Sequence, residues 1–271
     1  MGIVYLDGAT ISIKEGVSIM VSSGTELHVF NSELYACGNM WAGIVVENGG
    51  QLFVHDSEIR DAQYGTKVNP DGNLILRNST YDHNYVGVYV KDLSGGSVII
   101  DGTTFSCNDC LGSSPLKRGY SGQTPGPNVI SFAGIEAYNS IFDIGVSGSA
   151  SNIFKDCTRG ASLENCYNTI VNNTFSDITA GVYYLPLGGY GIFSDMSGGG
   201  TLRQLGYGEF SYSPISFDNC PTAIYAKGGS ASVLSNHMSN VEKGIRIDKI
   251  KGQNINASNN LIVATEKGIL L

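Results

Sequence analysis

Six side chains able to bind or polarise a ligand occupy one repeated position in this 271-residue sequence, two residues after a Gly or Ala that opens an apolar run. They are Lys67, Tyr89, Glu136, Tyr183, Tyr225 and Arg246. A tyrosine presents a flat amphipathic ring and a hydroxyl group, which suits it to lie under a sugar ring and hydrogen-bond it. The charged members can hold polar groups beside that ring. We therefore predict that this row binds a glycan or another surface partner.

The same row does not supply a catalytic centre. Acid–base chemistry on a glycosidic bond needs groups within a few ångströms of the reacting atoms. Lys67 and Glu136 are two repeats apart and Glu136 and Arg246 four, or roughly 10 and 19 Å at the usual strand spacing. Carboxylates for a reaction would have to come from loops. The loop candidates are Asp92, Asp109, Asp195 and Glu209.

The distribution of His and Cys gives little support for metal chemistry. The four histidines occupy different positions of the repeat and form no pair at ligand spacing. Cys107 and Cys110, in the stretch CNDC, can form a local disulfide, whereas a zinc site would need a second such pair. Cys157 and Cys220 stand where another repeat has Ala62, which predicts small core residues. We predict no resident metal or cofactor.

A fixed spacing links the row to the elements that must position it. A large apolar residue stands six positions before the Gly or Ala, as from Tyr81 to Gly87 and from Phe175 to Gly181. Successive Gly-type positions are 22, 22, 47, 26, 21, 42, 21 and 24 residues apart, at Gly43, Gly65, Gly87, Gly134, Gly160, Gly181, Ala223, Gly244 and Gly268. A period of this size is typical of leucine-rich repeats and of β-solenoids.

The composition of each repeat favours the β-solenoid. Short runs of β-branched and aromatic residues surround the Gly, as in GVYV at 87 and GNLIL at 72, and no helical pattern is present. Asn, Asp or Ser precedes the large apolar residue by two or three positions, where it can adopt a left-handed corner and hydrogen-bond from coil to coil. Examples are Asn31, Ser57, Asn78, Asn152, Asn173 and Asn236. The sequence therefore predicts an all-β, right-handed parallel β-helix of about nine or more coils of 21–24 residues.

From residue 24 to 271 the chain resembles the pectin-lyase-like right-handed β-helix superfamily, and in particular secreted and surface-attached bacterial β-helix proteins. The stretch MWAGIVVENGGQLFVHDSEIRDAQYG at 40 carries this resemblance well. It implies the fold but not the function, because the superfamily holds lyases, hydrolases, adhesins and structural modules. In its catalytic members the resemblance implies clustered carboxylates for acid–base work or calcium, with a nearby Arg or Lys in the lyases. Calcium is thus the cofactor to expect if the chain is a lyase.

The continuous repeat predicts a single domain over 1–271, with a cap or first coils in 1–34. Insertions are predicted at about 107–131 and 184–214, where the spacing stretches. They would bulge as loops, and long loops often carry function. An alternative interpretation of the second insertion gives it a coil of its own through GYGIF. The abrupt ends lead us to expect a part excised from a longer secreted chain.

The composition of the chain limits the classes of partner that it can bind. With 42% hydrophobic and 15% charged residues the chain is not disordered, and its net charge of −8 disfavours nucleic acids and anionic membrane surfaces. No run of 18 apolar residues is present, so membrane insertion is not expected. We expect an extracellular or cell-surface location. The expected partners are a polysaccharide or surface glycan and other domains of a longer parent chain.

Three functions remain open from the sequence. The preferred hypothesis is a non-catalytic extracellular module that binds glycan along the row. The first alternative is a polysaccharide lyase or glycoside hydrolase whose carboxylates come from the inserted loops. The second is a structural stalk of a surface protein, in which the tyrosines only shield neighbouring strands.

Overall fold

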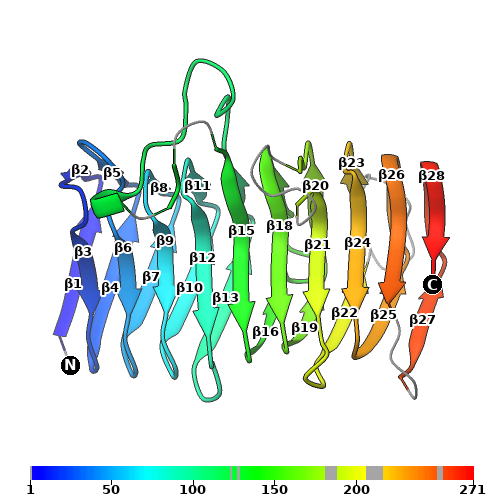
Figure 1. Cartoon of the computed structure of the whole chain (residues 1–271). Helices are drawn as coiled ribbons and strands as arrows, with labels where there is room; N and C mark the ends of the chain where they lie inside the picture. The colour runs from blue at the N-terminus through cyan, green and yellow to red at the C-terminus, as the bar shows by residue number, and fades with distance from the viewer. Residues whose placement is uncertain (1, 123, 127–128, 181–187, 206–215, 249–252) are drawn as a thin grey trace.

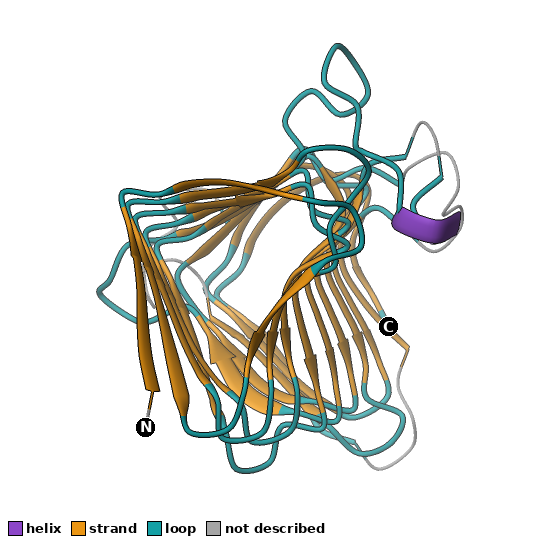
Figure 2. Cartoon of the chain, turned by 90° about the vertical axis from the view of Figure 1, so that its left-hand side faces the viewer, coloured by secondary structure: helices purple, strands orange, loops and turns teal. Residues whose placement is uncertain are grey.

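The chain winds into a β-solenoid with three strands in most coils (Figure 1), and Figure 2 views the same solenoid from its left-hand side. This computed structural model describes residues 2–122, 124–126, 129–180, 188–205, 216–248 and 253–271. Strands of successive coils pair in parallel, as β4 does with β1 and β7. The prediction of an all-β parallel solenoid is confirmed.

Three rows of paired strands, which we call the first, second and third sheet, run along the solenoid, and the second and third are joined near the C-terminal end into one hydrogen-bonded sheet. The first contains β1 (Gly2–Asp7), β4 (Thr25–Phe30), β7 (Gln51–His55), β10 (Asn73–Arg77), β13 (Ser97–Asp101), β16 (Ile141–Ile144), β19 (Tyr167–Ile170), β22 (Thr201–Leu205), β25 (Ser230–Leu234) and β27 (Ile255–Ser258). The second contains β2 (Thr10–Ile13), β5 (Glu33–Ala36), β8 (Glu58–Arg60), β11 (Thr80–Asp82), β14 (Thr104–Ser106), β17 (Asn152–Lys155), β20 (Asn173–Ser176) and β23 (Phe217–Asp218).

The third sheet is the one nearest the viewer in Figure 1. It contains β3 (Ser18–Val21), β6 (Gly43–Val46), β9 (Tyr64–Val68), β12 (Val86–Lys91), β15 (Ser131–Tyr138), β18 (Cys157–Glu164), β21 (Tyr190–Asp195) and β24 (Thr222–Lys227). Two longer strands, β26 (His237–Asp248) and β28 (Leu261–Leu270), continue from the second sheet into the third.

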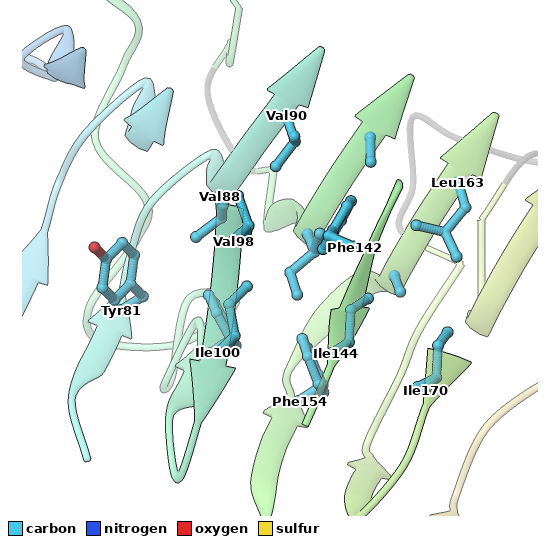
Figure 3. Packing of buried hydrophobic residues seen from close by; sticks show 14 of the residues in the cluster. Tyr81, Val88, Val90, Val98, Ile100, Phe142, Ile144, Phe154, Leu163 and Ile170 are labelled. Carbon is cyan, nitrogen blue, oxygen red and sulfur yellow. The ribbon is translucent and has the colours of Figure 1, made fainter. Parts of the chain in front are cut away.

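Inward-facing aliphatic and aromatic side chains fill the solenoid (Figure 3). Four phenylalanines of successive coils stack nearly parallel, with ring centroids 4.9, 4.9 and 4.8 Å apart. They are Phe105, Phe154, Phe175 and Phe217. Stacking at this distance follows from the strand spacing, which sets identical side chains of neighbouring coils in contact.

The recurring Gly makes room for this stack. A Cβ atom on Gly134 would lie 2.5 Å from the ring of Phe154, and one on Gly160 would lie 2.3 Å from the ring of Phe175. Each ring of the stack therefore packs against the Gly of the preceding coil. Where the six-residue spacing holds, one coil supplies both a bulky residue and the Gly that makes room for the bulky residue of the next coil.

Asn, Asp and Ser form the corners as predicted. Asn31, Asp56 and Asn78 all have φ near +50°, in the left-handed region that Asn and Asp tolerate. The residues next to these corners hydrogen-bond from coil to coil. For example, the Ser57 amide donates to Ser79 Oγ at 3.2 Å. Farther along, Asn152 Nδ2 donates to Asn173 Oδ1 at 2.9 Å and Asn236 Nδ2 to Asn260 Oδ1 at 3.1 Å.

The second predicted insertion, 184–214, contains β21 and β22. The alternative interpretation, a coil through GYGIF, therefore describes this region. Gly191 takes the place that the spacing gave to Gly181, since Tyr190 pairs with Arg159 and Ile192 with Ala161. Phe175 and Gly191 are sixteen positions apart, against six for Phe154 and Gly160, so the extra residues lie between β20 and β21.

The segment between β14 and β15 returns toward the first coils and packs on the side of the solenoid. Its short helix η1 (Tyr120–Gly122), the green box in Figure 1, lies near β3, and a Cβ on Gly16 would be 3.1 Å from the Tyr120 ring. A disulfide joins Cys107 to Cys110. Across the described residues, no helix has the length and apolarity needed to span a membrane.

Candidate functional site

The strands of the third sheet carry a group of aromatic side chains on their outer side. Strand alternation explains their direction, because Val88 and Val90 enter the core and Tyr89 between them points outward. We call this surface the aromatic face. It consists of Tyr64, Tyr89, Tyr138, Tyr190, Phe193 and Tyr225, together with Glu136 and Arg159.

Strand register defines the central row of the third sheet. Paired residues run in the order Val45, Lys67, Tyr89, Glu136, Ser162, Phe193, Tyr225, Arg246 and Leu270. Five of the six predicted site residues, all except Tyr183, therefore lie in one row. They form two groups of neighbours in the row. One contains Lys67, Tyr89 and Glu136, and the other contains Tyr225 and Arg246. Ser162 and Phe193 separate these groups.

The prediction that Tyr183 belongs to this row is wrong. Phe193 pairs with Ser162 on one side and Tyr225 on the other, and so fills the place assigned to Tyr183. Tyr183 itself lies outside the described residues. The error follows from the displaced Gly, because counting two residues from Gly181 rather than Gly191 selects the wrong side chain.

Three tyrosines form the half of the aromatic face nearer the N-terminus. The Tyr89 ring meets Tyr64 at 5.1 Å and 61° and Tyr138 at 5.9 Å and 46°. The Lys67 ammonium group lies 5.9 Å from the centre of the Tyr89 ring. The rings are inclined to each other, so they pack edge against face and not face against face. Burial raises the pKa of Tyr64 and Tyr89, so both hydroxyl groups remain protonated donors at neutral pH.

The other half contains Tyr190, Phe193 and Tyr225. Phe193 meets Tyr225 edge to face at 5.5 Å and 69°. Arg246 lies 4.5 Å from the centre of the Tyr225 ring, and the Tyr225 hydroxyl group donates to Asp248 at 2.5 Å. Burial and this bond raise the pKa of Tyr225 to about 12. Tyr225 is therefore held in one orientation by charged neighbours.

Arg159 lies between the two halves and is only 7% exposed. Its guanidinium carbon is 4.1 Å from the Phe193 ring centre, 5.0 Å from that of Phe132 and 5.9 Å from that of Tyr190. Its Nη1 donates to Ser162 Oγ at 2.8 Å. Burial lowers the pKa of Arg159, although a guanidinium stays charged at any ordinary pH. Aromatic rings thus fix a cation in the middle of the face.

Glu136 occupies the neighbouring strand. Its Oε1 accepts the Tyr138 hydroxyl hydrogen at 2.7 Å. Burial raises the pKa of Glu136, while the Tyr138 bond and the charge of Arg159 partly oppose the rise. The face therefore contains one carboxyl group that binds protons more readily than usual, beside one permanent cation.

The loop carboxylates singled out in the sequence have separate partners in the described part of the chain. Asp195 forms an ion pair with Lys227 at 2.7 Å, Asp92 accepts from Asn139, and Asp109 accepts from Ser113 inside the inserted segment. Glu209 lies outside the described residues. Among the residues with defined positions, no three His, Cys, Asp or Glu side chains are close enough to hold a metal ion.

Sequence reasoning missed Arg159, Tyr64, Tyr190 and Tyr138. The first three directly precede the row Gly, and their own row runs from Tyr64 through Val86, Ala133 and Arg159 to Tyr190. Tyr138 follows Gly134 by four positions. A search one residue before and four after each Gly would have found these side chains.

The first sheet also carries a group of aromatic residues on its outer side. His28 stacks with Phe53 at 4.4 Å and 4°, and with Tyr5 at 4.7 Å and 25°. Phe30 is inclined to its neighbours, at 58° to His28 and 80° to His55. The first sheet therefore carries both stacked and inclined rings, and both geometries stabilise aromatic pairs.

Comparison with known proteins agrees with the architecture. Residues 15–192 match a sequence model described as the right handed beta helix region. Neither a curated protein nor a solved structure matches the chain. The match covers more than half of the chain and includes the strands from β3 to β20, in agreement with the pectin-lyase-like resemblance. The chain belongs to the family of right-handed β-helix proteins.

Proposed function

We propose that the aromatic face is a non-catalytic glycan-binding surface. The observation that carries this proposal is the set of six inclined aromatic rings with Arg159 and Glu136 at its centre. A sugar offers one apolar face for a ring and a rim of hydroxyl groups for charged and polar neighbours. The face provides both kinds of contact on rigid strands, which limits the entropy lost on binding.

The extent of the face favours a chain of sugars over a single one. Tyr89 and Tyr225 lie on β12 and β24, four strands apart in the order β12, β15, β18, β21 and β24. At the usual strand spacing this separation is roughly 19 Å. An oligosaccharide lying across the strands would contact both tyrosines and pass over Arg159.

The proposal is tested with the triple variant Tyr89→Ala, Phe193→Ala and Tyr225→Ala. The purified chain is incubated with neutral and acidic polysaccharides, with and without calcium, and retention is measured. If each lost contact between a ring and a sugar is taken to be as strong as an aromatic pair, about 0.5–1.5 kcal/mol, the triple variant should lose affinity by about tenfold or more. Arg159→Lys, which keeps the charge but loses the planar group, should also weaken retention.

A matched control removes aromatic rings elsewhere. The double variant Tyr5→Ala and Tyr167→Ala changes two exposed tyrosines of the first sheet and should bind as the unaltered chain does. Unchanged affinity in the triple variant, with its fold verified by circular dichroism, would contradict the proposal. No retention of any polysaccharide by the unaltered chain would favour a structural stalk instead.

A polysaccharide lyase or glycoside hydrolase is the second candidate. Glu136, whose pKa is raised by burial, favours it because such a carboxyl group is suited to donate a proton. The same incubation is scored for new reducing or unsaturated ends. Products that disappear in Glu136→Gln would support this candidate, and retention without products would support the binding module.

We further propose that the protein acts outside the cell or at its surface, where its partner would be a polysaccharide or a surface glycan. The Cys107–Cys110 disulfide supports this location, because disulfides persist mainly in oxidising compartments. Other domains of a longer parent chain would then place the aromatic face near that partner.

A further inference from the structure

The described residues of the inserted segment between β14 and β15, which are 107–122, 124–126 and 129–130, are held to the side of the solenoid by several contacts. The Met40 amide donates to the Arg118 carbonyl oxygen at 2.8 Å, and the Lys117 ammonium group meets Asp61 at 2.9 Å. An apolar cluster joins the segment to Met40 through Cys107, Cys110, Leu116, Val129 and Ile130. The segment is thus a strap with its own small core.

One histidine of the solenoid also binds this strap. His83 follows β11 at a corner, with φ of 54°, and is 9% exposed. Its Nδ1 lies 2.6 Å from Asp82 Oδ2, and its Nε2 lies 2.8 Å from the backbone carbonyl oxygen of Ser114, in the strap. Asp82 also accepts from Ser106 Oγ and from the Asn108 amide, at the start of the strap.

Both partners of the imidazole are acceptors. A carboxylate and a backbone carbonyl carry no hydrogen, so each contact requires an N–H on the ring. The imidazolium ion has two N–H groups and satisfies both contacts. The neutral imidazole has one, so loss of the proton turns one contact into an opposition of two lone pairs.

We propose that His83 is a pH-sensitive clasp that fastens the strap to the solenoid at Ser114 when protonated and loosens it when neutral. The clasp acts on Ser114 and hence on the part of the strap that carries Leu116, Lys117 and Arg118. Its release weakens the packing over Met40. The proposal does not depend on glycan binding.

The charges around His83 favour the protonated form. Burial lowers the pKa of His83, but the hydrogen bond and charge of Asp82, the Ser114 carbonyl and the charge of Asp61 raise it above 6.5 overall. Asp109, in the strap, also interacts with His83 by charge. Two cations lie against these acids, since Lys117 pairs with Asp61 at 2.9 Å and Arg60 approaches the same carboxylate at 4.0 Å.

The sign of the pH dependence follows from a raised pKa. The stabilisation from the clasp is complete below pH 6.5, the ordinary value for histidine. It is lost as the pH rises through the higher pKa of the folded state. The strap is therefore expected to be tight in mildly acidic solution and looser in alkaline solution.

The test combines titration of the imidazole with hydrogen exchange of the strap. NMR of the ring nitrogens from about pH 5 to about pH 9 locates the protonation of His83. Amide exchange, corrected for its intrinsic pH dependence, is followed at Met40, Ser113 and Gly119, whose amides are hydrogen-bonded within or to the strap. We expect exchange there to accelerate by about tenfold across the titration of His83.

Two variants complete the test. His83→Gln cannot donate to both acceptors in this geometry, so exchange of the strap should be fast at every pH and trypsin should cut sooner after Lys117 and Arg118. His55→Gln, on the first sheet, should behave as the unaltered chain. Strap exchange that does not follow the titration of His83 in the unaltered chain would overturn the proposal. Equal strap exchange in His83→Gln and the unaltered chain would do the same.

Discussion

At the scale of single residues, Arg159 and Glu136 give the aromatic face its chemical character. Arg159 is surrounded by Phe132, Tyr190 and Phe193, which stabilise its charge where water is scarce. Glu136 accepts a hydrogen bond from Tyr138, but burial still raises its pKa above that of an exposed carboxyl group. A fixed cation and a titratable acid therefore stand beside one another on one surface.

Replacing Glu136 should change how stability depends on pH. Its pKa is raised above 4.5 by burial, so the folded state binds more protons than the unfolded state just above that pH. The free energy of unfolding should fall as the pH rises from 4.5 through the raised pKa and then level off. Glu136→Gln should remove this component of the decline, as chemical denaturation at several pH values would measure. An identical pH profile in both proteins would contradict the assignment.

The residues of the site were only partly predictable. Tyr89, Glu136 and Tyr225 follow from counting two positions after Gly, because strand alternation fixes their direction. Phe193 could not be found in this way, since the residues added after Phe175 displace the Gly to position 191. The neighbours of Arg159 depend on which strands pair, and an uneven period leaves that pairing open.

At the scale of elements, the pairing of Gly with a bulky apolar residue explains the coil. Strands β9, β12, β15, β18 and β21 each pass a Gly where the next coil's ring enters the core, and at Gly244 the entering side chain is Ile262. This rule made the strands, corners and parallel pairing predictable from the sequence. The rule located the insertion between β14 and β15 but did not predict its path, because that path depends on contacts with distant coils.

Gly160→Ala should destabilise the fold. The added Cβ would lie 2.3 Å from Phe175 and 2.6 Å from the carbonyl oxygen of Gly191, so the stack or the backbone must move. Overpacking of this kind costs about 1–3 kcal/mol. Gly268→Ala is the matched control, because it holds the same position of the coil and meets nothing within 4 Å. Denaturant unfolding of both variants measures the difference, and equal midpoints would exclude this role of Gly160.

At the scale of the whole molecule, each coil contacts mainly the coils on either side. Strand contacts such as β12 with β9 and β15, and β24 with β21 and β26, all join neighbouring coils. Stability is then approximately a sum of coil terms and interfaces between coils. Damage in one place should therefore spread only a short distance along the solenoid.

Leu74→Ala tests this local behaviour. Leu74 is fully buried in β10, and its truncation should cost about 2–5 kcal/mol. Hydrogen exchange should accelerate in β10 and in β7 and β13, which both pair with it, and remain slow in β21 and β24. Uniform acceleration along the chain would show instead that the solenoid unfolds as one cooperative unit.

The matched register of successive coils also bears on how such a chain changes in length over evolution. Gly43, Gly65 and Gly87 are separated by 22 residues each, and the strands between them pair without a shift. A duplication or loss of one such block would join a corner to an equivalent corner and leave the neighbouring strands in register. Addition of a whole coil therefore leaves strand pairing at the junction unchanged, whereas a few added residues have no place in the paired strands and must form a loop.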